Sequence, residues 1–173
     1  MMCVRRPAVW MIAAALTTSV AMLAGDSLPA HYEKHATTFT DTFETGPIGG
    51  TFTTPRRGVP SDGITLRVPE KAVEGPVSLG IGYSTGVLRL RAGTPSGVVI
   101  VIGANRPVTF RRPLEISISF IPNPKHITLV GYAIDAIGHL RPVDVIKVDM
   151  AAGHASFLAN QPVSLTWVYI DRE

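Results

Sequence analysis

Hydrophobic residues alternate with polar or small residues along most segments beyond residue 60, and this alternation constrains the fold most strongly. In residues 115–120, for example, Ile116, Ile118 and Phe120 are separated by Ser117 and Ser119. A repeat of two places alternate side chains on opposite faces of a β-strand, whereas an amphipathic helix repeats every 3.6 residues. The same alternation runs through residues 64–68, 77–83, 88–91 and 163–170. No helix-length segment after residue 30 shows a 3.6-residue stripe, so the sequence predicts an all-β fold.

Many prolines and glycines fall between the alternating runs. Examples are Gly49-Gly50, Pro60, Pro95, Pro107 and Pro124. Strands at a spacing of about 8–12 residues with such turns favour a two-sheet, immunoglobulin-like β-sandwich over an open sheet. Residues 98–102 (VVIVI) are apolar without alternation. This run predicts a central strand that is covered on both faces.

Residues 1–24 have the pattern of a secretory signal peptide. A basic start containing Arg5 and Arg6 precedes an apolar run, and the small residues of Ser19-Val20-Ala21 suit signal peptidase. An uncleaved signal anchor is the alternative, since an apolar run of about 17 residues is at the short limit for spanning a bilayer. Residues 25–45 are predicted to form a flexible N-terminal segment, because residues 25–37 show no periodicity. The sandwich is predicted over residues 46–173.

The number of cysteines indicates the cellular compartment, and the net charge indicates which class of partner is excluded. Cys3 is the only cysteine and lies in the leader, so the mature domain is predicted to contain no disulfide. An exported domain without disulfides suits a bacterial periplasmic or secreted protein. Two of the 16 basic residues, Arg5 and Arg6, also belong to the leader, so 14 basic residues face 13 acidic ones. This near-neutral balance gives no electrostatic basis for binding nucleic acid.

Several segments follow the order of motifs in one family of β-sandwiches. Residues 49–52 (GGTF) precede a strand at residues 62–69 (DGITLRVP) and a turn at residues 70–73 (EKAV). Residues 110–118 (FRRPLEISI) place a phenylalanine and a proline at a strand entry. Further matches are Tyr132, Asp135, Gly138 and Thr166-Trp167-Val168. Over about residues 46–170 the chain therefore resembles the ZU5 domain of ankyrins, netrin receptors and tight-junction scaffolds.

The ZU5 resemblance implies a β-sandwich that holds protein partners. Two family features are absent. The Cys-Gly-Pro stretch of the family is replaced by residues 102–105 (IGAN), and the His-Phe-Ser tripeptide at which some members cleave themselves is replaced by residues 160–164 (NQPVS). Self-cleavage is therefore not implied for this chain.

Two groups of polar residues resemble catalytic or metal-binding patterns. His31 and His35 flank Glu33, a spacing that would place two metal ligands on one face of a helix. No helix is predicted there and no third ligand is adjacent, so a solvated segment is favoured. Asp135, His139, Asp144, Asp149 and His154 lie within twenty residues of one another. They flank predicted turns at residues 136–138 and 151–153, where such side chains usually cap backbone groups.

Arginines and aromatic residues offer two possible binding surfaces. The arginines are Arg56, Arg57, Arg89, Arg91, Arg111 and Arg112, and solubilising charge that protects strand edges is the favoured interpretation. The aromatic residues are Tyr83, Tyr132, Trp167 and Tyr169. They could form a sugar-stacking platform, but their positions in alternating strands favour packing in the core.

The sequence thus predicts a non-enzymatic, exported β-sandwich that binds proteins or has a structural role in the bacterial envelope. No catalytic, cofactor-binding or metal-binding residue is assigned, and neither a cofactor nor a nucleic-acid partner is expected. Contact is expected through the loops at residues 55–62 and 103–107 or through an exposed strand edge. A carbohydrate-binding module and a membrane-anchored subunit of an envelope assembly are the alternatives. The location is periplasmic or secreted if the leader is removed, and the inner membrane if it is retained.

Overall fold

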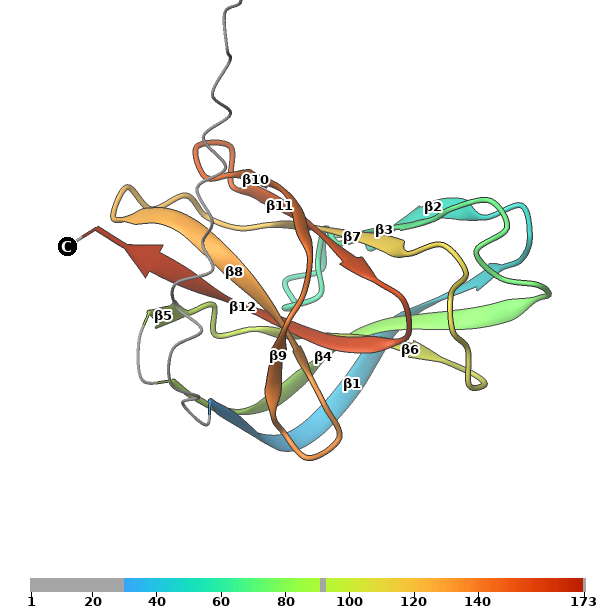
Figure 1. Cartoon of the computed structure of the whole chain (residues 1–173), viewed down its shortest axis with the longest axis horizontal. Helices are drawn as coiled ribbons and strands as arrows, with labels where there is room; N and C mark the ends of the chain where they lie inside the picture. Colours follow the sequence, from blue (N-terminus) through green and yellow to red (C-terminus); the bar gives the residue numbers. More distant parts are fainter. Residues whose placement is uncertain (1–29, 91–92, 173) are drawn as a thin grey trace, which may run out of the picture.

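The computed structural model describes residues 30–90 and 93–172 of the 173-residue chain. Over these residues the chain forms strands and no helix, and every strand pairs antiparallel to its neighbours (Figure 1). The predicted all-β fold is confirmed. The leader predicted at residues 1–24 lies outside the described residues. None of the described residues belongs to a helix long and apolar enough to span a membrane.

Two sheets pack against each other as an immunoglobulin-like sandwich. The larger sheet contains β1 (His31–Thr45), β4 (Val77–Arg89), β5 (Thr94–Pro95), β6 (Val99–Ala104), β8 (His126–Ile134), β9 (Leu140–Pro142) and β12 (Val163–Asp171). The smaller sheet contains β2 (Gly50–Thr53), β3 (Thr65–Val68), β7 (Leu114–Ser119), β10 (Val145–Asp149) and β11 (His154–Ala159). The strand orders are β1-β4-β6-β12-β8-β9, with β5 beside β12, and β10-β11-β7-β3-β2.

The predicted start of the sandwich is wrong. Residues 25–45 are predicted to be flexible, yet residues 31–45 form β1, which pairs with β4 along its length. The register shifts between Lys34 and Ala36 and between Phe39 and Asp41, which places bulges at His35 and Thr40. Each bulge adds a residue and changes the face to which the following side chains point. An unbroken period of two is therefore missing from the sequence of β1.

The main core lies between the two sheets. Its largest fully buried hydrophobic side chains are Phe157, Leu66, Leu79, Ile81, Ile100, Ile102, Leu114, Ile116 and Leu165. These residues come from both sheets, and removal of their apolar surface from water is the main source of stability. Strand β6 is buried on both faces, because Ile100 and Ile102 join this core while Val99 and Val101 join a second cluster. The central strand predicted from residues 98–102 is confirmed.

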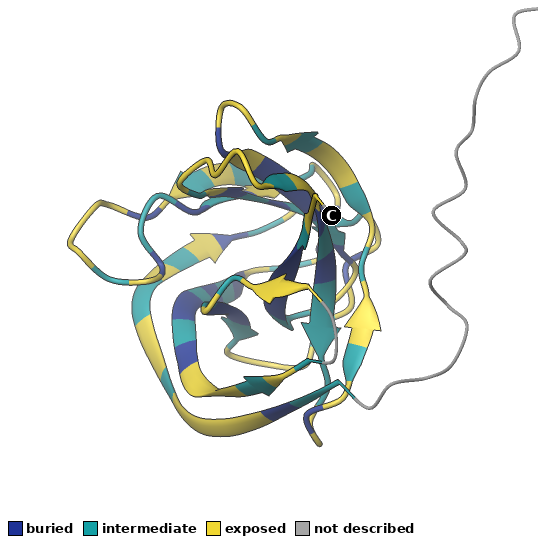
Figure 2. Cartoon of the chain, turned by 90° about the vertical axis from the view of Figure 1, so that its left-hand side faces the viewer, coloured by how far each residue is buried: buried dark blue, intermediate teal, exposed yellow. Residues whose placement is uncertain are grey.

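The larger sheet curls until its two ends meet (Figure 2). At the start of β1, His31 forms a bridge with His139, which lies just before β9. The backbone N–H of Tyr32 donates to the carbonyl oxygen of Gly138 at 2.8 Å. Tyr32 is buried inside the curl with the second cluster. One backbone hydrogen bond and one bridge thus close this sheet on itself.

Two of the four aromatic residues considered for sugar binding lie in the core. Trp167 and Tyr169 are only 5% and 9% exposed. The indole Nε1–H of Trp167 donates to the hydroxyl of Tyr169 at 2.9 Å, and the ring of Tyr169 stacks on that of His126. Burial raises the pKa of the Tyr169 hydroxyl, although the Trp167 hydrogen bond acts in the opposite direction. For these two residues the predicted core role is confirmed, and neither presents a ring face to a sugar.

We expect the substitution Tyr169→Phe to lower the free energy of unfolding by about 1–2 kcal/mol, because it leaves the buried Trp167 donor without an acceptor. Urea unfolding followed by the fluorescence of Trp167 measures this change. Tyr83→Phe is the matched control, since the Tyr83 side chain is partly exposed and no hydrogen bond of its hydroxyl is found among the described residues. Equal losses for both variants would contradict the role of the Trp167–Tyr169 hydrogen bond.

Candidate functional site

The outer edge of β1 is the longest strand edge that no other described strand covers. β1 has 15 residues and pairs only with β4, apart from the bridge at His31. The other outermost strands are short: β9 has three residues, β2 has four and β10 has five. Figure 2 shows β1 as the outer ribbon of the curled sheet. Its free edge carries backbone N–H and C=O groups of the kind to which another chain can add as a strand.

Two contacts limit the accessible part of this edge. At one end, the N–H of Tyr32 is bonded to Gly138. At the other end, the guanidinium Nη1 of Arg57 donates to the carbonyl oxygen of Thr40 at 3.2 Å. Residues 33–39 lie between these contacts, and we call them the β1 window. Most side chains of the window are exposed.

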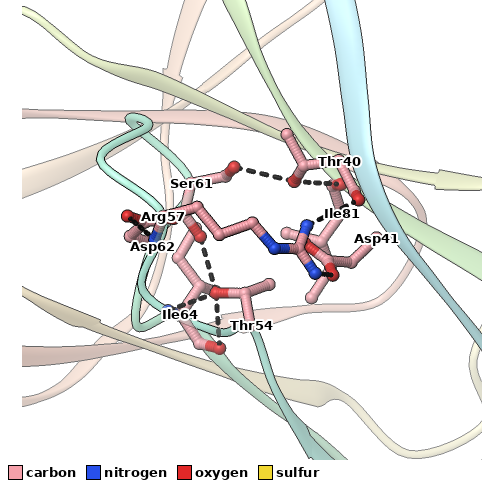
Figure 3. Close-up of polar contacts among 8 residues, drawn as sticks. All are labelled: Thr40, Asp41, Thr54, Arg57, Ser61, Asp62, Ile64 and Ile81. Carbon is pink, nitrogen blue, oxygen red and sulfur yellow. Dashed lines mark hydrogen bonds and ion pairs between the residues drawn. The ribbon is translucent and has the colours of Figure 1, made fainter.

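The loop between β2 and β3 covers the edge of β1 at Thr40 (Figure 3). This loop includes residues 55–62, which are predicted to be a contact loop. Arg57 extends from this loop to Asp41, with 2.9 Å between Nη2 and Oδ1. The base of the loop is tied to β1 as well, because the hydroxyls of Thr40 and Ser61 lie 2.8 Å apart. Ser61 is fully buried. The loop is therefore a fixed boundary of the β1 window rather than a free contact surface.

Asp62 holds the tip of this loop in shape. Its carboxylate Oδ2 accepts hydrogen bonds from the backbone N–H groups of Arg57, Gly58 and Val59, at 2.6, 2.5 and 3.1 Å. Partial desolvation acts to raise the pKa of the Asp62 carboxyl, but these hydrogen bonds and the charge of Arg57 outweigh it. The pKa of Asp62 is therefore below its ordinary value, which means that the folded loop favours the ionised form.

The lowered pKa of Asp62 gives a pH-dependent contribution to stability. Because the carboxyl releases its proton more readily in the folded state, the contribution is present above the unfolded-state pKa of about 4. It is lost as the pH falls through the lower folded-state pKa. We expect the wild-type protein to melt at a higher temperature than Asp62→Asn at pH 7, and the gap to shrink below about pH 4. A gap that stays constant down to pH 2 would contradict this account.

The second predicted contact loop, at residues 103–107, starts too early, because residues 103 and 104 belong to β6. The remainder is held by local hydrogen bonds. Asn105 accepts a hydrogen bond from the backbone N–H of Ser78, and Arg106 donates to the carbonyl oxygen of Pro76 at 3.2 Å. Arg111 forms an ion pair with Glu74 nearby. Two basic side chains at this end of the sandwich, Arg106 and Arg111, therefore bind neighbouring loops. Arg91 lies outside the described residues.

The histidines considered as metal ligands do not come together. His35 lies at the first bulge of β1, whereas the ring of His31 lies 6.3 Å from that of His139, measured between centroids. Asp135 caps the turn between β8 and β9 by accepting hydrogen bonds from the backbone N–H groups of Ile137 and His139. Among the described residues, no three histidine, cysteine or acidic side chains are grouped as a metal site would require.

Two further polar candidates, Asp149 and His154, lie on β10 and β11. Asp149 accepts a hydrogen bond from the N–H of Ala152 and so caps the turn between β10 and β11, as the sequence predicts. The ring Nδ1 of His154 lies 3.1 Å from the Ser119 hydroxyl on the exposed face of the smaller sheet. In the described residues no hydrogen bond connects Asp149 to His154. Asp149 and His154 nevertheless lie opposite each other on β10 and β11, and both line a hollow together with Ser119.

A polar cluster at the end of β12 is not anticipated by the sequence. The Asp171 carboxylate contacts Nδ1 of His126, and Thr94 donates a hydrogen bond to Oδ2 of Asp171 at 2.7 Å. The hydrogen bond from Thr94 and that from His126 hold the pKa of Asp171 below its ordinary value. These residues join β5, β8 and the last residue of β12. The contacts therefore connect the last residue of β12 to both neighbouring strands.

The β1 window is the part of the candidate site that sequence reasoning missed. A usable signal exists in residues 37–45, where threonine and phenylalanine, both strand-favouring residues, are frequent. No known protein-family model matches this chain, and no curated protein matches it. The site is therefore interpreted from its own geometry.

Proposed function

We propose that this chain is an exported, non-enzymatic β-sandwich that binds proteins in the bacterial envelope. The observation that carries the proposal is the edge of β1 between Tyr32 and Thr40, which no strand of residues 30–90 and 93–172 covers. A partner segment that adds to such an edge gains main-chain hydrogen bonds, while neighbouring side chains provide selectivity. Folded proteins usually shorten or block edges of this kind, because an open edge also invites aggregation. An edge blocked at both ends but open between them suits the binding of a short segment.

Site-specific photo-crosslinking in cells tests the proposal. A photoreactive amino acid replaces Thr38, an exposed residue of the β1 window, in the full chain with its leader. We expect a discrete adduct with another envelope protein. The matched control places the same amino acid at Thr51, an exposed threonine of edge strand β2.

Comparison of the two positions distinguishes binding at the β1 window from non-specific crosslinking. Adducts from position 38 and not from position 51 support binding at the β1 window. Equal labelling at both positions, or no adduct at position 38, would remove the support for strand addition at this edge.

Export is tested separately, by the intact mass of the protein in cytoplasmic, membrane and soluble envelope fractions. We expect a soluble envelope species that begins between residues 22 and 31. Full-length protein in the membrane fraction would instead establish the signal-anchor alternative, with partners to be sought among membrane complexes.

A further inference from the structure

A cavity adjoins the first residues of the β1 window. Its volume is about 430 Å³, and it is lined by residues 31–34 of β1, residues 134–138 at the turn after β8, and Ser164 of β12. Glu33 and Lys34 thus belong both to the window and to the cavity wall. A segment that pairs along the window towards Tyr32 therefore reaches this cavity.

The wall opposite β1 carries aliphatic side chains on a fixed turn. Ile134 and Ile137 line the cavity, and Ile137 is 68% exposed. The turn is held by Asp135, whose carboxylate accepts two backbone hydrogen bonds, and by Gly138, which packs against β1. A Cβ atom at Gly138 would lie 2.3 Å from the carbonyl oxygen of Tyr32. Ile137 is therefore an exposed apolar group on a rigid support, which favours its use as a contact.

The shape of the edge favours a flexible segment over a second folded copy of this chain. The turn after β8 closes the window at Tyr32, and the loop between β2 and β3 closes it at Thr40. The seven residues between these points span at most about 23 Å, because the bulge at His35 shortens a fully extended strand. A second folded copy would have to align the edge of its own sheet along β1, and the two boundaries would obstruct it. A free peptide of about six or seven residues fits between them.

The charges around the cavity favour a peptide without a strong net charge. Glu33 and Lys34 carry opposite charges on the β1 side. On the other side, the carboxylate of Asp135 lies 3.6 Å from Nη2 of Arg141 and is therefore already paired with a cation. No excess of one sign is left to attract a strongly acidic or basic ligand.

We propose that the β1 window binds an extended, near-neutral peptide segment of a partner protein, with one aliphatic side chain placed in the cavity beside Ile134 and Ile137. This inference rests on the proposed function, because it specifies what the edge of β1 binds. Main-chain pairing along residues 33–39 supplies hydrogen bonds, and the aliphatic side chain supplies selectivity.

The probe for the test is a linear peptide selected from a random displayed library against the full chain. Its affinity is measured for the wild type, for Ile137→Ser and for Ile121→Ser. Ile121 is the matched control, because it is 90% exposed and lies in the loop between β7 and β8. Amide hydrogen exchange with and without the peptide reports whether residues 33–39 become protected.

The expected result combines two observations. The peptide protects the amides of the β1 window, and Ile137→Ser weakens its binding by about tenfold or more while Ile121→Ser leaves it within about twofold. Window protection with no effect of Ile137→Ser overturns the inference but leaves the proposed function standing. Binding without protection of residues 33–39, or a library that yields no peptide, counts against both.

Discussion

Replacement of Phe157 by alanine is expected to lower the free energy of unfolding by about 3–5 kcal/mol. Phe157 is fully buried on β11, and its ring connects the two sheets. On the opposite sheet the ring lies against Gly131, where an added Cβ would be 2.5 Å from Cε1 of Phe157. The ring centroid of Trp167 is 6.4 Å away. Alanine would leave a cavity that β-strands fixed by their hydrogen bonds cannot close.

Chemical denaturation with matched circular dichroism and fluorescence transitions measures the effect of Phe157→Ala. Phe39→Ala is the control, because Phe39 is 52% exposed and covers Gly80 and Gly103 on the surface of the larger sheet. We expect the loss for Phe39→Ala to be less than half that for Phe157→Ala, since less apolar surface returns to water. Equal losses would mean that Phe157 is not a central contact between the sheets.

The second large effect is expected at Gly82 on β4, which lies opposite Phe39 of β1. A Cβ atom at residue 82 would lie 2.1 Å from the carbonyl oxygen of Thr38 and 2.7 Å from Cα of Phe39. Both are backbone atoms and cannot rotate away, so β1 must move off β4. We expect Gly82→Ala to cost about 3 kcal/mol or more, at the upper end of what overpacking costs. Amide exchange of residues 36–42 is expected to rise with it.

Gly46→Ala is the matched control for Gly82→Ala. No heavy atom lies within 4 Å of a Cβ built at Gly46, and its φ is outside the positive range. We therefore expect Gly46→Ala to be neutral or to stabilise the protein by a few tenths of a kcal/mol, about the gain from a less flexible unfolded chain. If Gly82→Ala were equally neutral, the close approach of β1 to β4 would be refuted, and with it the geometry of the β1 window.

The sequence does not predict the contacts that Phe157 makes. Phe157 lies in β11, where no alternating run is predicted, and its contact with Gly131 joins residues 26 positions apart. Most strands with unbroken alternation are found as predicted, as in β7, where Leu114, Ile116 and Ile118 are buried between partly or fully exposed neighbours. The run at residues 88–91 is an exception, because β4 ends at Arg89 and Arg91 lies outside the described residues. Alternation reports which residues face inward, but not which residues they meet.

The candidate site is likewise predicted only in part from the sequence. The turns at residues 136–138 and 151–153 are predicted from local sequence, because glycine and aspartate carry the information needed to form them. Strand β1 is missed, because its bulges at His35 and Thr40 interrupt the pattern that identifies a strand. Its assignment depends on pairing with β4, which at the pair Phe39 and Gly82 lies 43 positions further along the chain.

The sequence by itself determined the fold class, the sandwich, the buried central strand and the core positions of Trp167 and Tyr169, because period and residue type act locally. Only the tertiary structure decided that residues 31–45 join the larger sheet and that this sheet closes on itself at Tyr32 and Gly138. It also decided that no described strand covers the edge between Tyr32 and Thr40. Each of these features depends on which distant backbone groups hydrogen-bond to one another. Residue types alone do not encode such a pairing, because backbone donors and acceptors are nearly the same in every residue.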